Sequence, residues 1–349
     1  MTVAKKAPTI RELAQAAGVS LSTVSIVLSG KSEERRITPE TQAKVLDAAR
    51  ALGYQTNVSA RRLRSQTDAS IVVAVFWASD FRAPLMVRFL RGLQSAVLSS
   101  GRRAEIVIHP YHNDALHESM VALGLCHAAI ICNASPADME FLESFNPPVP
   151  IVLYNRHSAR FCTVNVDDQA MGAMAARVLA GRGHRQVVLL TSDSVFPGMD
   201  ARADGFVTTA EAAGLSVLRI HEDNSAAGGY QGALAVAAMR PTPDGVFAIS
   251  DAMAIGALRA FHQRGVRVPE DTELIAIGNG DKDQEEYAVV PLSVVHLPME
   301  KMAVECFDLA LGLVDGSVTQ VRSVKLDTSY VQRDSCGGIG PGEGAFPAA

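Results

Sequence analysis

The sequence predicts an N-terminal all-α helix-turn-helix domain followed by a larger α/β domain with parallel sheets. Three observations lead to this prediction. The first 56 residues form short amphipathic helices, the remainder alternates apolar runs with helix-length amphipathic stretches, and the net charge changes sign between the two parts. With 349 residues, 48% of them hydrophobic, the chain is long enough to bury two or three separate cores.

Three short helices are predicted in the N-terminal part, which we call the head. A capping box at Thr9–Glu12 starts the first helix, and Gly18 ends it where a positive φ is convenient. Ser20 is a good N-cap for a second helix, and Thr38–Pro39 supplies an N-cap and a first-turn proline for a third helix that stops before Gly53. This spacing is typical of a helix-turn-helix.

The apolar faces of these helices predict one small common core. The residues expected to face inward are Val24, Val27 and Leu28 from the second helix and Val45, Leu46 and Ala49 from the third. The opposite face of the second helix is small and uncharged, with Ser22, Ser25, Ile26 and Ser29.

The charge is distributed unevenly along the chain. The first 65 residues contain eleven Lys and Arg and five Asp and Glu, which gives +6, and since the whole chain carries −5 the remainder carries −11. A basic head on an acidic body favours a polyanionic partner for the head. The alternative is a basic face that is simply solvated.

From Ser70 onward, in the part that we call the body, strands alternate with helices. The predicted strands are Ile71–Val75, Glu105–Ile108, Ala129–Cys132, Ile151–Tyr154, Val187–Leu190, Gly245–Ile249 and Leu274–Ile277. The predicted helices are Leu85–Leu98, Gln169–Leu179, Ala201–Ala213, Gly229–Met239 and Ala252–Gln263. This order predicts parallel sheets covered on both faces, with a ligand site at the carboxyl ends of the strands.

Other classes of protein are disfavoured by the motifs. No run approaches the roughly 20 apolar residues of a membrane span and the N-terminus lacks a secretory signal, so we expect a cytoplasmic protein. The five cysteines form no CxxC pair, and the spacing of His109, His112 and His117 fits no helical zinc pattern. Without a Gly-x-Ser-x-Gly elbow or a phosphate loop, we expect neither an enzyme nor a bound cofactor or metal.

The head resembles the LacI/GalR family of bacterial transcriptional regulators. The matching runs are Thr9–Ala14, Ala17–Ser20, Thr23–Ser25 and Ala60–Arg64, and a looser match continues to Arg333. The resemblance implies a two-lobed, periplasmic-binding-protein-like body, with the chain crossing between lobes near residues 165, 291 and 327. It also implies a homodimer that binds a pseudo-palindromic double-stranded DNA operator and a small-molecule effector, such as a sugar or a related metabolite, between the lobes.

The expected domains follow from this resemblance. Residues 1–56 form the DNA-binding domain, 57–69 a hinge helix and linker, 70–336 the effector-binding and dimerisation domain, and 337–349 a tail expected to be disordered because it is rich in Gly and Pro.

The resemblance also implies which residues contact DNA. Leu21, Ser22 and Ile26 stand where base contacts are made, and because Ile26 cannot make the bidentate guanine contact of an arginine, we expect it to contact thymine methyl groups. The alternative is that Ile26 packs within the head. The full expected set is Thr9, Ser20, Leu21, Ser22, Thr23, Ser25, Ile26, Asn57, Ala60, Arg61, Leu63 and Arg64.

The segment from Asn57 to Arg64 is too short to be a stable helix alone and should fold only when held. By resemblance it is a hinge helix that orders on DNA, where Leu63 enters the minor groove as a wedge and the arginines neutralise phosphates. The alternative is a plain basic linker.

For the effector, the resemblance implies that Arg202 grips hydroxyl or carboxylate groups; the alternative is an exposed cation at a helix start. The full expected set is Phe76, Trp77, Asp80, Phe81, Asn155, Arg202, Asn224, Ser250, Asp251 and Asp281. Phe76, Trp77, Asp80 and Phe81 are equally consistent with ordinary lobe-surface residues. Gly280 replaces an aspartate of the family pattern, for which Asp281 is an alternative, and Asn224 replaces an aromatic platform, so the resemblance supports a pyranose ligand less firmly than it supports the fold.

The sequence thus favours a sequence-specific DNA-binding transcriptional regulator, expected to be a repressor, that is controlled allosterically by its effector. A periplasmic-type solute receptor would share the body but not the head. A sugar-processing enzyme would need a catalytic pair that the sequence does not contain.

Overall fold

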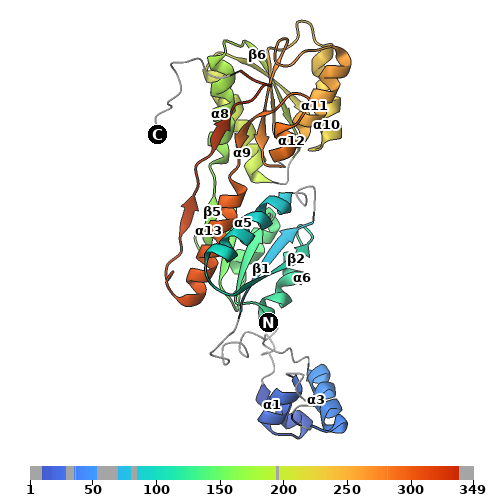
Figure 1. Ribbon diagram of the computed structural model, residues 1–349, viewed down its shortest axis with the longest axis vertical. Helices are drawn as coiled ribbons and strands as arrows, with labels where there is room; N and C mark the ends of the chain where they lie inside the picture. The colour runs from blue at the N-terminus through green and yellow to red at the C-terminus, as the bar shows by residue number, and fades with distance from the viewer. Residues whose placement is uncertain are drawn as a thin grey trace. The chain divides into compact units, whose positions relative to one another are not determined.

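The computed structural model describes residues 10–28, 35, 37–52, 70–79, 85–193, 196–280 and 282–337. The chain divides into two compact units, Met1–Ala69 and Ser70–Ala349, which are the head and the body (Figure 1). Residues 57–69 of the predicted hinge and 338–349 of the predicted tail lie outside the described residues.

The head contains three helices, α1 (Ile10–Ala17), α2 (Leu21–Leu28) and α3 (Pro39–Leu52). Gly18 has a φ of +64°, which glycine adopts without a steric penalty, so α1 ends there. The hydroxyl of Ser20 accepts a hydrogen bond from the backbone N–H of Thr23 at 3.1 Å and so caps α2. The three predicted helices of the head are therefore confirmed.

The head core is formed by six buried side chains: Leu13, Ala14, Val24, Val27, Val45 and Ala49. The prediction that Leu46 also faces inward is wrong, since its side chain is 36% exposed. Val45 and Ala49 lie four residues apart and define the buried stripe of α3, and Leu46 is rotated away from that stripe by about 100°.

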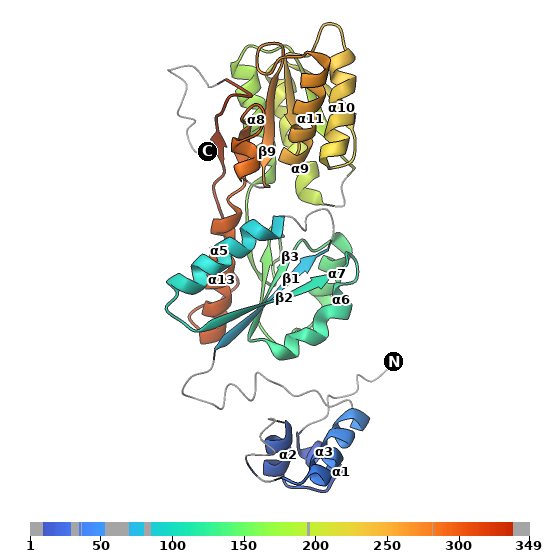
Figure 2. The same cartoon turned by 45° about the vertical axis from the view of Figure 1, so that its right-hand side comes forward.

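The first lobe of the body is built on a parallel sheet with the strand order β11-β5-β4-β3-β1-β2 (Figure 2). Its strands are β1 (Ile71–Ala78), β2 (Ala104–Tyr111), β3 (Ala128–Cys132), β4 (Ile151–Tyr154), β5 (Cys162–Asn165) and β11 (Ser323–Lys325). One face packs against α5 (Met86–Ser99) and α13 (Met299–Asp315), and the other against α6 (Leu116–Ser119), the 3-10 helix η2 (Met120–Leu125) and α7 (Pro136–Ser144).

The second lobe has the strand order β12-β10-β9-β8-β6-β7, with β12 antiparallel to β10 and every other pair parallel. Its strands are β6 (Gln186–Thr191), β7 (Ser216–His221), β8 (Gly245–Ala248), β9 (Glu273–Gly278), β10 (Ser293–His296) and β12 (Ser329–Val331). Its helices are α8 (Asp168–Gly181), α9 (Pro197–Ala212), α10 (Ala226–Ala238), α11 (Asp251–Arg264) and α12 (Lys282–Glu286).

Glycines allow two helix pairs of this lobe to pack with their backbones close together. A Cβ on Gly172 of α8 would lie 1.8 Å from the carbonyl oxygen of Arg202 in α9, and a Cβ on Gly256 of α11 would lie 1.8 Å from that of Ala226 in α10. Any larger residue at either position would force the paired helices apart.

The chain passes between the lobes three times. The first passage follows β5 and the third joins β11 to β12, close to the predicted positions 165 and 327. The second passage lies between β10 and α13, at Leu297–Pro298, and not near Pro291. Pro291 precedes β10, a strand that the sequence pattern did not reveal.

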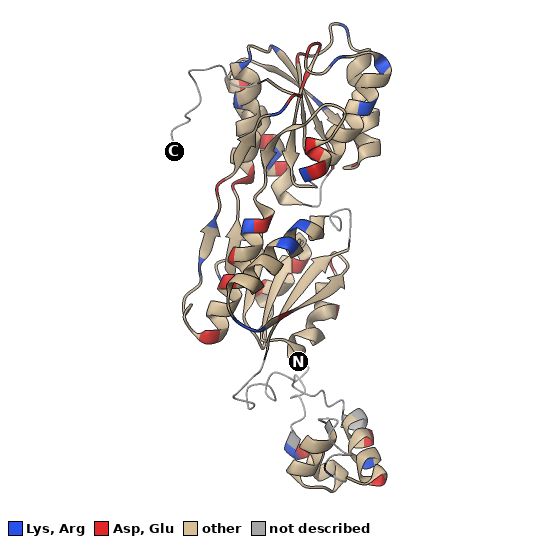
Figure 3. Ribbon diagram, viewed as in Figure 1, with Lys and Arg blue, Asp and Glu red and all other residues tan. Residues whose placement is uncertain are grey.

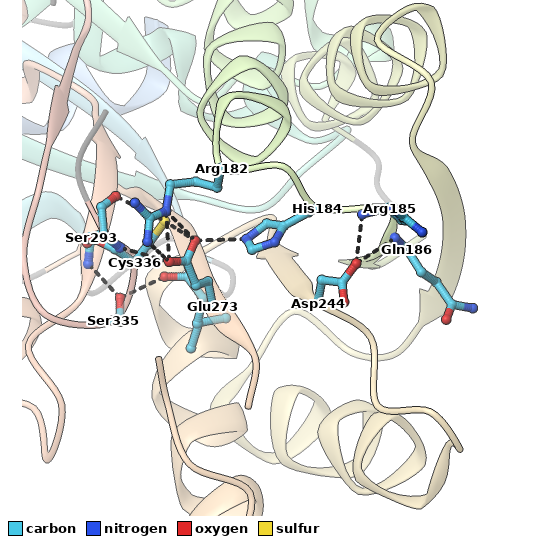
Figure 4. A network of polar contacts seen from close by, with 11 residues as sticks. Arg182, His184, Arg185, Gln186, Asp244, Glu273, Ser293, Ser335 and Cys336 are labelled. Atoms are coloured by element: carbon cyan, nitrogen blue, oxygen red, sulfur yellow. Dashed lines mark hydrogen bonds and ion pairs between the residues drawn. The ribbon is translucent and has the colours of Figure 1, made fainter. Parts of the chain in front are cut away.

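A polar network fastens the end of the described chain to the second lobe (Figure 4). Glu273 accepts from Arg182 at 2.7 Å, contacts His184 at 2.8 Å and accepts from the Cys336 thiol at 3.2 Å. Burial alone would raise the pKa of Glu273, but the hydrogen bonds from His184 and Arg182 lower it to about 2. Because Glu273 starts β9, this network holds the segment around Cys336 against the sheet.

Candidate functional site

The described surface of α2 is rich in hydroxyl groups and carries no charge. Ser20, Leu21, Ser22 and Ser25 are exposed, and the Oγ of Ser20 lies 2.7 Å from that of Ser22. Thr23 and Ile26 are half-buried at the border between this face and the core. The structure therefore places five of these residues on α2 and Ser20 at its N-cap, with four of the six accessible.

The charge of the head is less one-sided in the described residues than in the sequence. Lys and Arg occur together with Asp and Glu on the head helices (Figure 3). Most of the cations counted in the first 65 residues lie outside the described residues. So do nine of the expected site residues: Thr9, Asn57, Ala60, Arg61, Leu63, Arg64, Asp80, Phe81 and Asp281.

A cavity of about 40 Å³ lies between the two lobes of the body. Its lining comes from both lobes and from the second passage between them: Leu85, Asn133, Tyr154, Asn155, Phe196, Met199, Arg202, Asn224, Ile249, Ser250, Asn279, Leu297 and Met299. Several of these residues directly follow a strand, as expected for the carboxyl edge of a parallel sheet. The volume holds water but not a sugar ring in this arrangement of the lobes.

A second cavity of about 590 Å³ adjoins the first, and both are lined by Asn155. Its polar lining includes Arg156, Asn165, Asp168 and Lys325. Like the first cavity, the second is lined by residues of both lobes.

Arg202 is the charged residue of the first cavity. Its side chain is buried, and its Nε and Nη2 atoms donate to Asp168 Oδ1 at 2.8 and 2.7 Å. Its guanidinium carbon lies 5.9 Å from the ring centre of Phe196. An exposed cation at a helix start is therefore excluded, and Arg202 presents a neutralised, oriented guanidinium to the cavity.

Three other expected residues line the same cavity. The hydroxyl of Ser250 donates to Asn224 Oδ1 at 2.6 Å and also accepts from the backbone of Met253, which caps α11. Asn155 has a φ of +50° and its Nδ2 lies 3.4 Å from Asp168. The structure thus brings Asn155, Arg202, Asn224 and Ser250 together.

Asp251 lies behind the cavity and is not part of its lining. Its carboxylate accepts from the backbone N–H groups of Gly280 at 2.7 Å and Ala252 at 2.9 Å, and burial raises the pKa of Asp251 to about 6. A Cβ on Gly280 would lie 2.1 Å from Asp251 Oδ2. The aspartate of the family pattern therefore cannot stand at position 280 without moving Asp251.

Phe76 and Trp77 do not line this cavity either, and their predicted position after the first strand is corrected. β1 continues to Ala78 and does not end at Val75 as predicted, which leaves both residues inside the strand. Phe76 is fully buried and stacks on His109 with ring centres 5.1 Å apart. Trp77 is buried against Phe89 on the other face.

The sequence pattern missed several lining residues that it could have found. Asn133 and Asn279 each come directly after a strand, at the edge where a ligand was expected. Asn133 Nδ2 and Asn279 Oδ1 are buried and have no hydrogen-bond partner among the described residues. Such groups are costly unless a ligand or water satisfies them.

Within the part of the chain that the structure describes, no group of three His, Cys, Asp or Glu side chains is placed to hold a metal ion. No described helix combines the length and the apolar character needed to cross a membrane.

Comparison with known proteins agrees with this arrangement. Residues 9–57 match the model of bacterial regulatory proteins of the lacI family, and residues 176–336 match that of a periplasmic binding protein-like domain. The HTH-type transcriptional repressor PurR of Edwardsiella ictaluri (strain 93-146) is 25% identical over 339 residues, covering 94% of this chain and 96% of the relative.

Solved structures show the same relationship. A LacI family transcription regulator from Clostridium acetobutylicum is 31% identical and superposes with a TM-score of 0.73 over 76% of this chain and 100% of its own. A lac repressor dimer bound to operator and the anti-inducer ONPF, 20% identical, shares the fold with a TM-score of 0.65 over 95% of this chain and 99% of its own. The chain therefore belongs to the LacI family, and it is a DNA-binding transcriptional regulator with an effector-binding body.

Proposed function

We propose that the protein is a homodimeric repressor that binds a pseudo-palindromic duplex operator and responds to a small molecule held between the lobes of its body. The observation that carries the proposal is the cavity lined from both lobes around the buried Arg202–Asp168 pair. A ligand that contacts both lobes can change the angle between them, and two-fold symmetry matches two half-sites.

The exposed face of α2 supports base reading without charged side chains. Leu21, Ser22 and Ser25 offer one apolar group and two hydroxyls to a major groove, and Ile26 at the border of this face is the contact for a thymine methyl group. Sequence preference would then come from hydroxyl bonds and methyl contacts.

The proposal includes a hinge at residues 57–64, which lies outside the described residues. There Leu63 acts as a wedge in the minor groove and Arg61 and Arg64 contact phosphates, with Asn57 and Ala60 beside them. The Leu63→Ala variant should weaken operator binding and leave non-specific DNA binding unchanged, as measured by fluorescence anisotropy. Unchanged operator affinity would reject the wedge.

The effector contacts Arg202, Asn155, Asn224 and Ser250. Because the first cavity holds only about 40 Å³, the lobes must separate to admit a metabolite larger than water. A thermal-shift screen of metabolites on the full chain should find a compound that raises the melting temperature, and Arg202→Met should abolish that response. A hit whose response survives in Arg202→Met would place the effector elsewhere.

The protein acts on the genome in the cytoplasm, without a cofactor and without chemical turnover. If the purified chain converted a sugar phosphate to product, the proposal that it acts without chemical turnover would be contradicted.

A further inference from the structure

Arg88 of α5 is buried, and all five of its N–H donors are used. Its Nε and Nη2 donate to the two carboxylate oxygens of Glu300 at 3.0 and 2.7 Å, and Nη2 also donates to the carbonyl of Leu297 at 3.0 Å. Nη1 donates to the carbonyls of Gly280 at 3.3 Å and Gly278 at 3.4 Å. A guanidinium has five donors, so none is left over.

These bonds connect the two lobes at one point. Arg88 in α5 and Glu300 in α13 belong to the first lobe. Gly278 is the last residue of β9 in the second lobe, and Gly280 lies two residues after it. Arg88 therefore holds the carbonyls on both sides of Asn279.

Asn279 is the residue between the two held carbonyls, and it lines the cavity with a buried Oδ1 that has no hydrogen-bond partner among the described residues. The same loop is held from its own lobe, since Asp251 accepts from the Gly280 N–H at 2.7 Å. A ligand that bonds to Asn279 thus pulls on a loop whose position is fixed by one group from each lobe.

We propose that Arg88 is a positioning residue: it holds the Asn279 loop against the first lobe and so couples a ligand contact at Asn279 to the angle between the lobes. The regulatory role of this coupling rests on the proposed function, but the attachment of the Asn279 loop to Arg88 does not. Arginine suits this position because its planar fork serves Glu300 bidentately while its other donors reach carbonyls, which a lysine with three donors on one atom cannot reproduce.

The test measures the distance between the lobes in the full chain. All five native cysteines are buried, so spin labels can be placed on Glu118→Cys in α6 and Glu211→Cys in α9, two exposed positions on different lobes. We expect a single narrow distance distribution in the otherwise unchanged chain. Arg88→Met should lose that narrow peak, and the control Arg91→Met, at an exposed position on the same helix, should keep it.

A second variant separates positioning from folding. In Arg88→Met/Glu300→Met both charges are removed together, which avoids leaving a buried charge unpaired and should return the melting temperature toward that of the parent chain. The double variant still lacks the hydrogen bonds from Arg88 to the carbonyls of Gly278 and Gly280, so the narrow peak in its distance distribution should also be absent.

Two outcomes would overturn the proposal: a narrow peak in Arg88→Met, or a narrow peak regained in the double variant. Neither measurement involves DNA, so failure of the proposed regulatory function would show separately, as missing operator binding by the parent chain.

Discussion

Glu285 offers a direct test of the electrostatics around the Asn279 loop. Its side chain is completely buried; Oε2 lies 3.4 Å from Arg333 Nη1, and Oε1 has no hydrogen-bond partner among the described residues. Burial, with a smaller contribution from the nearby Asp251 carboxylate, raises the pKa of Glu285 to about 7 from the ordinary 4.5. Between about pH 4.5 and pH 7, the folded protein therefore keeps a proton on Glu285 that the unfolded chain has lost.

The magnitude and sign follow from this pKa difference. At about 1.4 kcal/mol per pH unit, the shift makes the ionised form cost the folded state about 3 kcal/mol. Because the folded-state pKa is raised, the free energy of unfolding is highest below the unfolded-state pKa and falls as the pH rises toward the folded-state value. Glu285→Gln keeps the neutral shape, so it should remove this loss and stabilise the protein by up to about 3 kcal/mol above neutral pH.

Urea unfolding of the full chain at about pH 5 and about pH 8 measures the effect. The gain from Glu285→Gln should be about 3 kcal/mol at the higher pH and only about 1 kcal/mol at the lower one. Glu286→Gln, at the exposed neighbouring position, is the matched control and should change neither curve. An equal effect of Glu285→Gln at both pH values would mean that the pKa of Glu285 is not raised in the folded protein.

Three further substitutions test other contacts. Ser20→Ala removes the N-cap of α2 and should lower the stability of the head by about 1 kcal/mol in a thermal melt followed by circular dichroism; no change would mean that the cap is dispensable. Gly172→Ala must push α8 from α9 and should cost about 1–3 kcal/mol in urea unfolding, whereas Gly124→Ala, where a Cβ would meet nothing within 4 Å, should be nearly neutral; equal costs would contradict the close packing. Asp168→Ala leaves the buried Arg202 charge without its carboxylate and should cost about 3 kcal/mol, so a neutral result in the same assay would show that the pair adds no stability.

The head could be predicted almost completely from the sequence because its signals are local. Ser20, Gly18 and Pro39 act on their own helix ends, and the structure has the three helices where these residues place them. The prediction that Leu46 faces inward was wrong because the orientation of this side chain depends on how α3 packs against α1 and α2, which the spacing within one helix does not determine.

The body could be predicted as alternating strands and helices, but its edges could not. β7, with the sequence Ser-Val-Leu-Arg-Ile-His, is an edge strand with exposed residues on both sides, so it shows neither a continuous apolar run nor strict alternation. β10 and β11 are only four and three residues long. They form strands because β9 and β5, which are distant in the sequence or separated by a helix, supply their hydrogen bonds, and a local sequence pattern does not show this pairing.

The candidate site shows the same limit. The family resemblance implies Arg202, but its partner Asp168 lies on another helix and is identified only by the packing of α8 against α9. Phe76 and Trp77 were expected to follow the first strand because that strand was predicted to end at Val75, whereas β1 continues to Ala78 and includes both. Arg88 gave no signal at all, since its partners come from residues 278–300 and meet it only in the folded body.

In the proposed function, the head selects particular duplex sequences and the body controls this selection. The most direct measurement captures genomic fragments on the purified full chain at about 0.15 M salt and sequences the fragments that are retained. We expect a small set of fragments that share a two-fold symmetric motif and whose retention changes when a metabolite that stabilises the chain is added. Retention of all fragments in proportion to their length, with and without metabolites, would contradict the claim.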